Sequence, residues 1–152
     1  MRRADRTDVP FLLDLMDEFY VEGGYRLNRT RAATAFTAIL ADARWGFVWI
    51  IDSSGEDVGY VVLTIRYAME YGGAIACLDD LYVKPAWRNR GLSTAALVHI
   101  REFCERTNIR ALTVEVGPDN GSAQTVYRRA GFSEAGNRQL LSLALAAPTH
   151  DV

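Results

Sequence analysis

The chain has 152 residues, which is enough for one domain with a substantial core and short for two. Its 49% hydrophobic and 24% charged residues are typical of soluble globular proteins. The formal net charge of −2 argues against a general nucleic-acid binder, so any anion site must be a local concentration of positive charge. We therefore expect one domain over residues 1–152 and no nucleic-acid partner.

Cysteine and histidine usage excludes further classes of protein. Cys77 and Cys104 lie far apart, and the chain has only 2 histidines, so we expect neither a disulfide framework nor a Cys/His zinc site. No uncharged run approaches the length of a membrane span, and acidic residues follow the first arginines at once, unlike in a signal peptide. The sequence predicts a cytoplasmic protein with no bound metal and no membrane partner.

The first part of the chain predicts two helices. Leu12, Met16 and Phe19 recur at helical spacing after Thr7, which is a candidate helix cap. Two glycines then end the pattern. An alanine-rich second helix follows over residues 28–43, with its apolar residues on the inner side.

From residue 45 onward, strands and helices alternate. β-Branched and aromatic residues predict strands over residues 45–51, 58–67, 74–83, 111–116 and 140–145, and helices over about 91–107 and 120–130. Gly131, followed by Phe132, is typical of a Schellman-type helix stop. The strands are too apolar to have one face in water, so helices should cover both sides of a mixed sheet. The predicted fold class is α/β (α+β).

A basic glycine turn precedes the helix over 91–107. Gly91 lets the backbone approach a ligand where a Cβ would collide. Successive amides can form a nest around a pyrophosphate, with two arginines as charge partners, and the residues concerned are Arg88, Asn89, Arg90, Gly91, Leu92, Ser93 and Thr94. Alone, the turn also fits a solvated basic helix start, because it is neither a Walker loop nor a dinucleotide-binding signature.

Two adjacent carboxylates, Asp79 and Asp80, stand in an otherwise apolar strand. Alternation sends them to opposite faces, so at least one should point toward a covered layer. Burial raises the pKa of a carboxyl, which suits the deprotonation of an amine, although either aspartate could instead reach water at the strand end. Glu115 alternates with apolar residues of the next strand, where a charge is also costly.

Asn120 and Tyr127 lie two turns apart on one face of the short helix over 120–130. Taken alone, Tyr127 fits a core tyrosine whose hydroxyl reaches the surface. A functional role becomes more plausible for both residues because the glycine turn precedes them in the same chain.

Residues 81–93, LYVKPAWRNRGLS, and a later pattern together resemble the GNAT superfamily of acetyl-CoA-dependent N-acetyltransferases. The phosphate-binding motif of that family, Q/R-x-x-G-x-G/A, is matched at Arg88 and Gly91, while Ser93 replaces the usual glycine or alanine. Because serine is small and its hydroxyl could itself reach phosphate, we expect binding to be retained. The later motif, N-x-x-A-x-x-x-Y-x-x-x-G-F, is matched at Asn120, Ala123, Tyr127, Gly131 and Phe132.

The resemblance covers nearly the whole chain and implies a fold and a cofactor. The fold is a mixed, mostly antiparallel central sheet of six to seven strands with helices on both faces. Acetyl-CoA is the implied co-substrate, and no metal is implied. The family also commonly forms dimers through a sheet edge or the last strand, so a homodimer could form.

The resemblance also implies roles for individual residues. The backbone of Leu81, Tyr82 and Val83 would pair with the pantetheine arm, and the amides from Asn89 to Thr94 would hold the pyrophosphate. Asn120 would bond the pantetheine region, and Tyr127 would protonate the leaving thiolate.

Four sources of a general base remain open. Glu115 matches the position of the base in the branch that acetylates protein N-termini, and Asp79 matches a carboxylate of the polyamine branch. Asp80 and a water molecule relayed from a carboxylate are further alternatives.

The function that these features favour is acetyl transfer from acetyl-CoA to a primary amine, either a small cationic amine or a protein N-terminus. The acidic residues on the acceptor side favour a cation. A non-catalytic acyl-CoA-binding sensor or regulatory module is the alternative, and an intact Tyr127 counts against it. A nucleic-acid-binding domain that uses Arg2, Arg3 and Arg6 is disfavoured by the charge balance.

Overall fold

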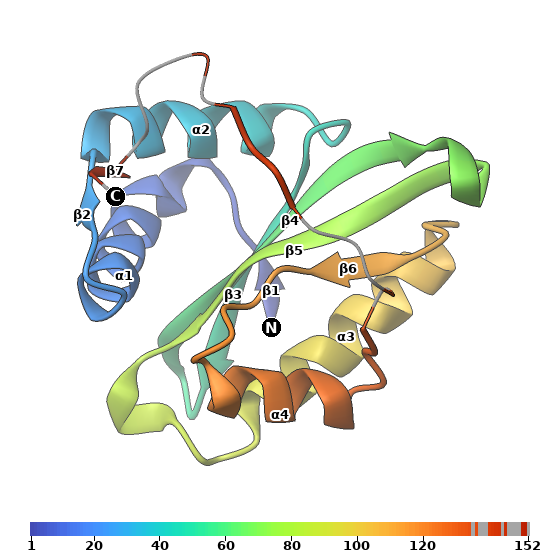
Figure 1. The fold of residues 1–152 in the computed structure, drawn as a ribbon. Coiled ribbons are helices and arrows are strands. Elements are labelled where there is room, and N and C mark those ends of the chain that lie inside the picture. Colours follow the sequence, from blue (N-terminus) through green and yellow to red (C-terminus); the bar gives the residue numbers. More distant parts are fainter. Residues whose placement is uncertain (135, 137–139, 144, 146–149, 152) are drawn as a thin grey trace.

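Five strands form the main sheet of the described chain, in the order β1-β3-β4-β5-β6. The computed structural model describes residues 1–134, 136, 140–143, 145 and 150–151. The strands are β1 (Arg2–Arg3), β3 (Gly46–Ser53), β4 (Glu56–Ala68), β5 (Gly73–Val83) and β6 (Leu112–Val114). Pairing is antiparallel from β1 to β5 and parallel between β5 and β6, which confirms the mixed, mostly antiparallel sheet (Figure 1). The described sheet thus has five strands where six to seven were predicted.

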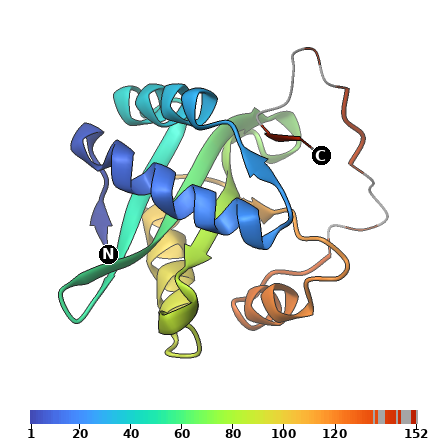
Figure 2. The ribbon, with the colours of Figure 1, turned by 90° about the vertical axis from the view of Figure 1, so that its left-hand side faces the viewer.

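Helices cover both faces of this sheet, as predicted. The α1 and α2 helices lie on one face and the α3 and α4 helices on the other (Figures 1 and 2). Their bounds are α1 (Val9–Glu22), α2 (Arg29–Ala41), α3 (Leu92–Arg106) and α4 (Gly121–Arg129), with short 3-10 turns at η1 (Arg6–Asp8), η2 (Met69–Tyr71) and η3 (Pro85–Trp87). Of the helices that the structure describes, none is both long and apolar enough to cross a membrane.

Alternation along β3 gives each face its own core. Val48 and Ile50 pack beneath α1 and α2, whereas Trp49 and Ile51 pack beneath α3. Burying a large apolar side chain contributes roughly 1.5–3 kcal/mol, so both layers are fixed to the sheet chiefly by this packing. The helices contribute fully buried residues to the two cores: Leu12, Leu15 and Phe36 to the first, and Ala96, Leu97 and Ile100 to the second.

A β-bulge at Asp79 exchanges the faces of the residues that follow it in β5. Leu78 and Asp80 pair with consecutive residues of β4, so Asp79 is the one extra residue. Before the bulge, Leu78 packs in the α3 core; beyond it, Tyr82 packs in the core beneath α1 and α2. Asp80 therefore points to the α1 side. Without the bulge, alternation along the strand would place it on the same face as Leu78.

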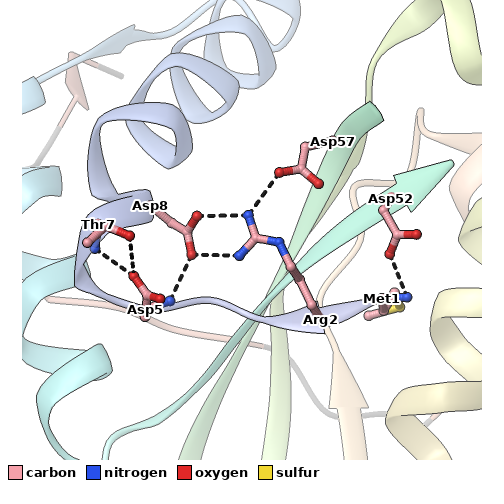
Figure 3. Close-up of polar contacts among 7 residues, drawn as sticks. All are labelled: Met1, Arg2, Asp5, Thr7, Asp8, Asp52 and Asp57. Carbon is pink, nitrogen blue, oxygen red and sulfur yellow. Dashed lines mark hydrogen bonds and ion pairs between the residues drawn. The ribbon is translucent and has the colours of Figure 1, made fainter. Parts of the chain in front are cut away.

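Arg2 of β1 ties the start of the chain to β4, as Figure 3 shows. Its guanidinium donates to both oxygens of Asp8, at 2.9 and 2.8 Å, and to Asp57 at 2.8 Å. The predicted Thr7 cap is wrong, because Asp5 accepts from the Thr7 amide at 2.7 Å and caps η1. The Thr7 hydroxyl donates to Asp5, and the N-cap residue of α1 is Asp8, so the helix begins at Val9.

The predicted strand over residues 140–145 does not occur in the described residues. Residues 140–143 and 145 have no strand structure, and residue 144 lies outside the described residues. A strand needs a hydrogen-bonded neighbour, and the described leucines of this segment are instead between 72% and 92% exposed. A short strand near the end, β7 (His150–Asp151), pairs with β2 (Arg26–Leu27).

Candidate active site

β5 and β6 diverge where the carboxylates stand. Within the described residues, their pairing ends at Leu78 and Val114, while β5 continues to Val83 with β4 on its other side. Asp79 and Glu115 are the first residues beyond the last pair, so they flank the opening. The backbone from Leu81 to Val83, which was predicted to pair with pantetheine, follows along the same edge of β5.

The glycine turn stands at the N-terminus of α3. Gly91 is the N-cap residue, and its φ of +78° is a left-handed conformation that favours glycine. A Cβ added at Gly91 would meet nothing within 4 Å, so the space beside the turn is open. Gly91 offers no side chain to cap the helix, which leaves the first-turn amides, from Leu92 to Thr94, for an external anion.

The two arginines of the turn are both held by the protein. Arg88 donates from Nε to the Val83 carbonyl at 2.8 Å and from Nη2 to the two oxygens of Glu22 at 2.9 and 2.7 Å. Arg90 donates to a backbone carbonyl at 3.1 Å and lies over the ring of Trp87, with its guanidinium carbon 4.7 Å from the centroid. The structure therefore places Arg88 against α1, on the far side of β5 from α3.

Asp80 is the buried carboxyl of the site, with only 8% of its surface exposed. Burial and the charge of Asp79 raise the pKa of Asp80 to about 7. The hydroxyl of Tyr60 donates to Oδ2 of Asp80 at 3.0 Å, which stabilises the ionised form and opposes the shift. A carboxyl with this pKa can exchange protons near neutral pH, as a general base must.

Asp79 and Glu115 are the exposed carboxylates at the opening. Partial burial and the charge of Glu115 raise the pKa of Asp79, so the structure brings the two predicted bases together. Neither side chain is as deep as Asp80. The three carboxylates therefore differ in environment, with one buried and two at the rim.

Tyr127 lies on α4, beside the Schellman stop predicted for that helix. The Phe132 amide donates to the Tyr127 carbonyl at 3.0 Å and the Gly131 amide to the Arg128 carbonyl at 3.1 Å. The Phe132 ring packs edge-on against Tyr127, with centroids 5.6 Å apart. Partial burial and the charge of Asp80 raise the pKa of Tyr127, so its hydroxyl remains protonated at neutral pH.

Asn120 caps α4. Its side-chain oxygen accepts from the Ala123 amide at 3.1 Å and from the Ser122 hydroxyl at 3.2 Å. The contact with pantetheine that the resemblance implies for Asn120 would therefore use the amide nitrogen of its side chain.

A cleft of about 1070 Å³ lies between β6, α3 and α4. Glu115 and Tyr127 both line it, and Leu97, Leu112 and Phe132 contribute apolar walls. A carboxylate and a protonated phenol thus share one partly apolar cavity, as an acid–base reaction on a bound substrate requires.

The model of the acetyltransferase (GNAT) family matches residues 10–132. That range contains the glycine turn, the diverging strands and Tyr127, and it is well over half of the chain. The chain belongs to the GNAT acetyltransferase family. As a GNAT protein it is an acetyl-CoA-dependent acyltransferase. Among the residues described, no three His, Cys, Asp or Glu side chains are grouped so that they could hold a metal ion.

Individual relatives extend this comparison. An uncharacterised N-acetyltransferase of Methanocaldococcus jannaschii is 27% identical over 103 residues, which are 60% of this chain and 46% of that protein, so the chain spans less than half of this relative. The aminoglycoside N(6')-acetyltransferase type 1 of Klebsiella aerogenes is 26% identical over 137 residues, which are 88% of this chain and 89% of that protein. A solved integron cassette protein from the mobile metagenome of Cole Harbour Salt Marsh is 44% identical, with a TM-score of 0.88 over 97% of this chain and 91% of that chain.

Two tyrosines near the carboxylates were not predicted from the sequence of this GNAT protein. Tyr60 of β4 bonds Asp80, and the pKa of Tyr20 of α1 is raised to about 12 by burial and by the charges of Asp80 and Asp79. Both belong to elements that precede the family motifs by many residues. The only sign of Tyr60 in the sequence was that a residue with a hydroxyl group lies within the apolar run of β4.

Proposed function

We propose that this GNAT protein transfers the acetyl group of acetyl-CoA to the primary amine of a small cationic molecule. The observation that carries the proposal is the opening between β5 and β6, where the buried Asp80 carboxyl lies on β5 and Glu115 and the protonated Tyr127 side chain line the adjoining cleft. Acetyl transfer to an ammonium ion needs a base for the nitrogen and an acid for the sulfur, and this site offers one of each.

Acetyl-CoA is proposed to follow the open edge of β5. Its pantetheine arm would add to the backbone of Leu81, Tyr82 and Val83 as an extra strand does. Its pyrophosphate would sit on the amides from Asn89 to Thr94, where the helix terminus carries about half a positive charge. The open space beside Gly91 and the left-handed backbone there support this placement.

Asp80 is proposed as the general base, acting directly or through one water molecule. Its raised pKa of about 7 suits proton exchange at neutral pH, whereas Asp79 and Glu115 stand at the rim, where they suit attraction of a cation. This assignment selects one of the alternatives that the sequence left open.

The proposed steps conserve protons and electrons. The Asp80 carboxylate takes a proton from the ammonium group, and the free amine attacks the carbonyl carbon of the thioester. The C–S bond then breaks, its electron pair stays on sulfur, and Tyr127 donates its proton to give the free thiol of CoA. The new amide nitrogen loses its second proton, through solvent, to the tyrosinate. Because charge on sulfur develops only in the transition state, the acid acts on rate and not on cofactor affinity.

The acceptor is proposed to be a small molecule with several positive charges. Three carboxylates around one opening favour such a cation, and the Klebsiella aerogenes relative is named for acetylating an aminoglycoside. A cationic amino sugar is therefore the first acceptor class to test, with a peptide that has a free N-terminus as the comparison acceptor.

The Tyr127→Phe variant tests the proposal. It keeps the ring that packs on Phe132 but removes the donor, so turnover should fall roughly a hundredfold, as for loss of a positioned acid. Release of free CoA with a panel of amines measures turnover, and calorimetry should find an unchanged dissociation constant for acetyl-CoA. The control is Tyr71→Phe, because Tyr71 lines the same cleft and has no proposed role. Wild-type turnover in Tyr127→Phe would make Tyr127 a packing residue.

A further inference from the structure

Arg88 is the first residue of the phosphate-binding motif, yet its side chain points away from the glycine turn. Its guanidinium forms two bonds with Glu22, at 2.9 and 2.7 Å, and one with the Val83 carbonyl, at 2.8 Å. It also lies over the ring of Tyr82, with the guanidinium carbon 5.5 Å from the centroid. Carboxylate, carbonyl and aromatic ring together fix this side chain in one orientation.

These contacts lie on the α1 side of the sheet. Tyr82 belongs to the core beneath α1 and α2, while the glycine turn begins the helix of the opposite layer. Arg88 therefore crosses the end of β5 and joins the start of the α3 layer to the last residue of α1, Glu22. This is a link between the two layers at the open end of the sheet.

A second bond joins the same two parts. The Tyr82 hydroxyl donates to Glu18 at 3.0 Å, and the Tyr82 ring packs on Phe19 with centroids 5.5 Å apart. Glu18 and Glu22 are one helical turn apart on α1. We call the four residues Glu18, Glu22, Tyr82 and Arg88 the α1 clasp.

The α1 clasp is continuous with the buried carboxyl. The ring of Tyr82 lies 6.2 Å from that of Tyr60, centroid to centroid, and the Tyr60 hydroxyl donates to Asp80. The helical turn that the clasp holds also contains Tyr20, on which the charges of Asp80 and Asp79 act. A shift of the end of α1 would therefore change the surroundings of the carboxyls.

We propose that Arg88 and Glu22 are positioning residues for the acceptor site: they hold the last turn of α1 beside Asp80 and so couple amine binding to the turn that receives the cofactor. The inference rests on the proposed function, since it needs an amine beside Asp80. It assigns Arg88 a role on the acceptor side, whereas the resemblance implies that Arg88 is a partner for the pyrophosphate.

Two single variants and their double test the proposal. Glu22→Ala and Arg88→Gln should each raise the KM for the amine at least about fivefold, the lower end of typical coupling between sites, while the acetyl-CoA dissociation constant stays within about twofold. The double variant should be no worse than either single variant, because both remove the same link. Asp14→Ala is the matched control, since Asp14 lies on the same helix as Glu22 but forms its 2.7 Å ion pair with Arg29 of α2, outside the clasp.

Two results would overturn the proposal. If Arg88→Gln weakens acetyl-CoA binding while Glu22→Ala leaves the amine KM unchanged, Arg88 is a ligand for phosphate and its contact with α1 is incidental. If both variants lower the melting temperature as Asp14→Ala does and leave both kinetic constants unchanged, the clasp serves stability alone.

Hydrogen exchange separates this inference from the proposed function. The amides of Gly23, Gly24 and Tyr25 close the end of α1 by bonds to carbonyls of its last turn. Their exchange should accelerate in both clasp variants but not in Asp14→Ala, whether or not any amine is a substrate. A wild-type protein that acetylates no amine would refute the proposed function, whereas unchanged exchange in the variants would refute the clasp.

Discussion

The proposed cofactor side and the proposed acceptor side of the site are built in different ways. The proposed cofactor side consists of short stretches of chain: one turn from Asn89 to Thr94 and one helix that has Asn120 as its N-cap and carries Tyr127. The acceptor side brings Tyr20, Tyr60 and Asp80 together from α1, β4 and β5. A phosphate can be bound by consecutive backbone amides, but a carboxyl acquires a raised pKa only when distant elements bury it. The first region is therefore local in sequence, and the second depends on the whole fold.

The largest expected effect lies on the cofactor side, at Gly91. Gly91→Glu would place a carboxylate against the pyrophosphate, and like charges in contact cost several kcal/mol, so affinity for acetyl-CoA should fall on the order of a thousandfold. The fold should persist, because the added side chain enters open space. Calorimetry with acetyl-CoA measures the loss.

Gly91→Ala is the control for this variant. It imposes the same left-handed strain at φ +78° without a charge, so its affinity should stay within about tenfold of wild type, as roughly 1 kcal/mol of backbone strain allows. Equal losses in the two variants would show that backbone shape, not charge, governs binding at the turn.

The next effect is on the acceptor side, at Asp80. Asp80→Asn keeps an acceptor for the Tyr60 hydroxyl but removes the proposed base, so turnover near neutral pH should fall roughly a hundredfold. Wild-type turnover should rise with pH through about 7, because the base acts only when ionised. The variant should recover part of its loss at high pH, where free amine is abundant. A pH–rate profile that the substitution leaves unaltered would move the base elsewhere.

The same substitution should also change how stability depends on pH. The folded-state pKa of Asp80 is about 7 and its ordinary value is 3.8, so between these values the unfolded chain ionises while the folded protein holds its proton. Wild-type stability should therefore fall as pH rises, by roughly 3–4 kcal/mol between pH 4 and pH 8 from this group, and Asp80→Asn should lack that loss. Urea unfolding of both proteins at the two pH values gives the difference, and parallel pH dependences would show that Asp80 is not held in its neutral form.

Smaller effects are expected at the rim of the opening. Asp79→Asn and Glu115→Gln each remove a charge that acts on the other carboxylates, so turnover should change less than about tenfold, which corresponds to one pKa unit. Steady-state rates across pH 6–9 test both variants. A hundredfold loss in either, with Asp80→Asn close to wild type, would reassign the base to that residue.

The smallest effect is predicted at Ser93, where this chain departs from the family motif. Ser93→Gly should change acetyl-CoA affinity about twofold or less, because the backbone amide and not the side chain is the proposed ligand. A tenfold loss by calorimetry, the size of a hydrogen bond to a charged group, would show that the Ser93 hydroxyl holds phosphate.

The contrast between the two regions explains what could be predicted from sequence. Helix periodicity, the Gly91 turn and the Gly131 stop are local signals, and the structure confirms each element that they predicted. Site roles drawn from the family motifs stay predictions.

Features that depend on pairing between strands were not visible in the sequence. Alternation correctly predicts that one of Asp79 and Asp80 is buried, but not which one, because the bulge depends on the register with β4. The orientation of Arg88 depends likewise on a carboxylate 66 residues away. The strand expected over residues 140–145 failed for the same reason, since strand-like composition does not supply a partner.

The open edge of β5 also bears on how the protein avoids self-association. A strand edge that presents several consecutive N–H and C=O groups is a template on which another chain can add and begin an aggregate. Here the bulge at Asp79 interrupts the edge at one end, a carboxylate projects beside it, and Arg88 occupies the Val83 carbonyl at the other end. The remaining stretch, from Asp80 to Tyr82, is short, so it offers a foreign strand few consecutive groups with which to pair.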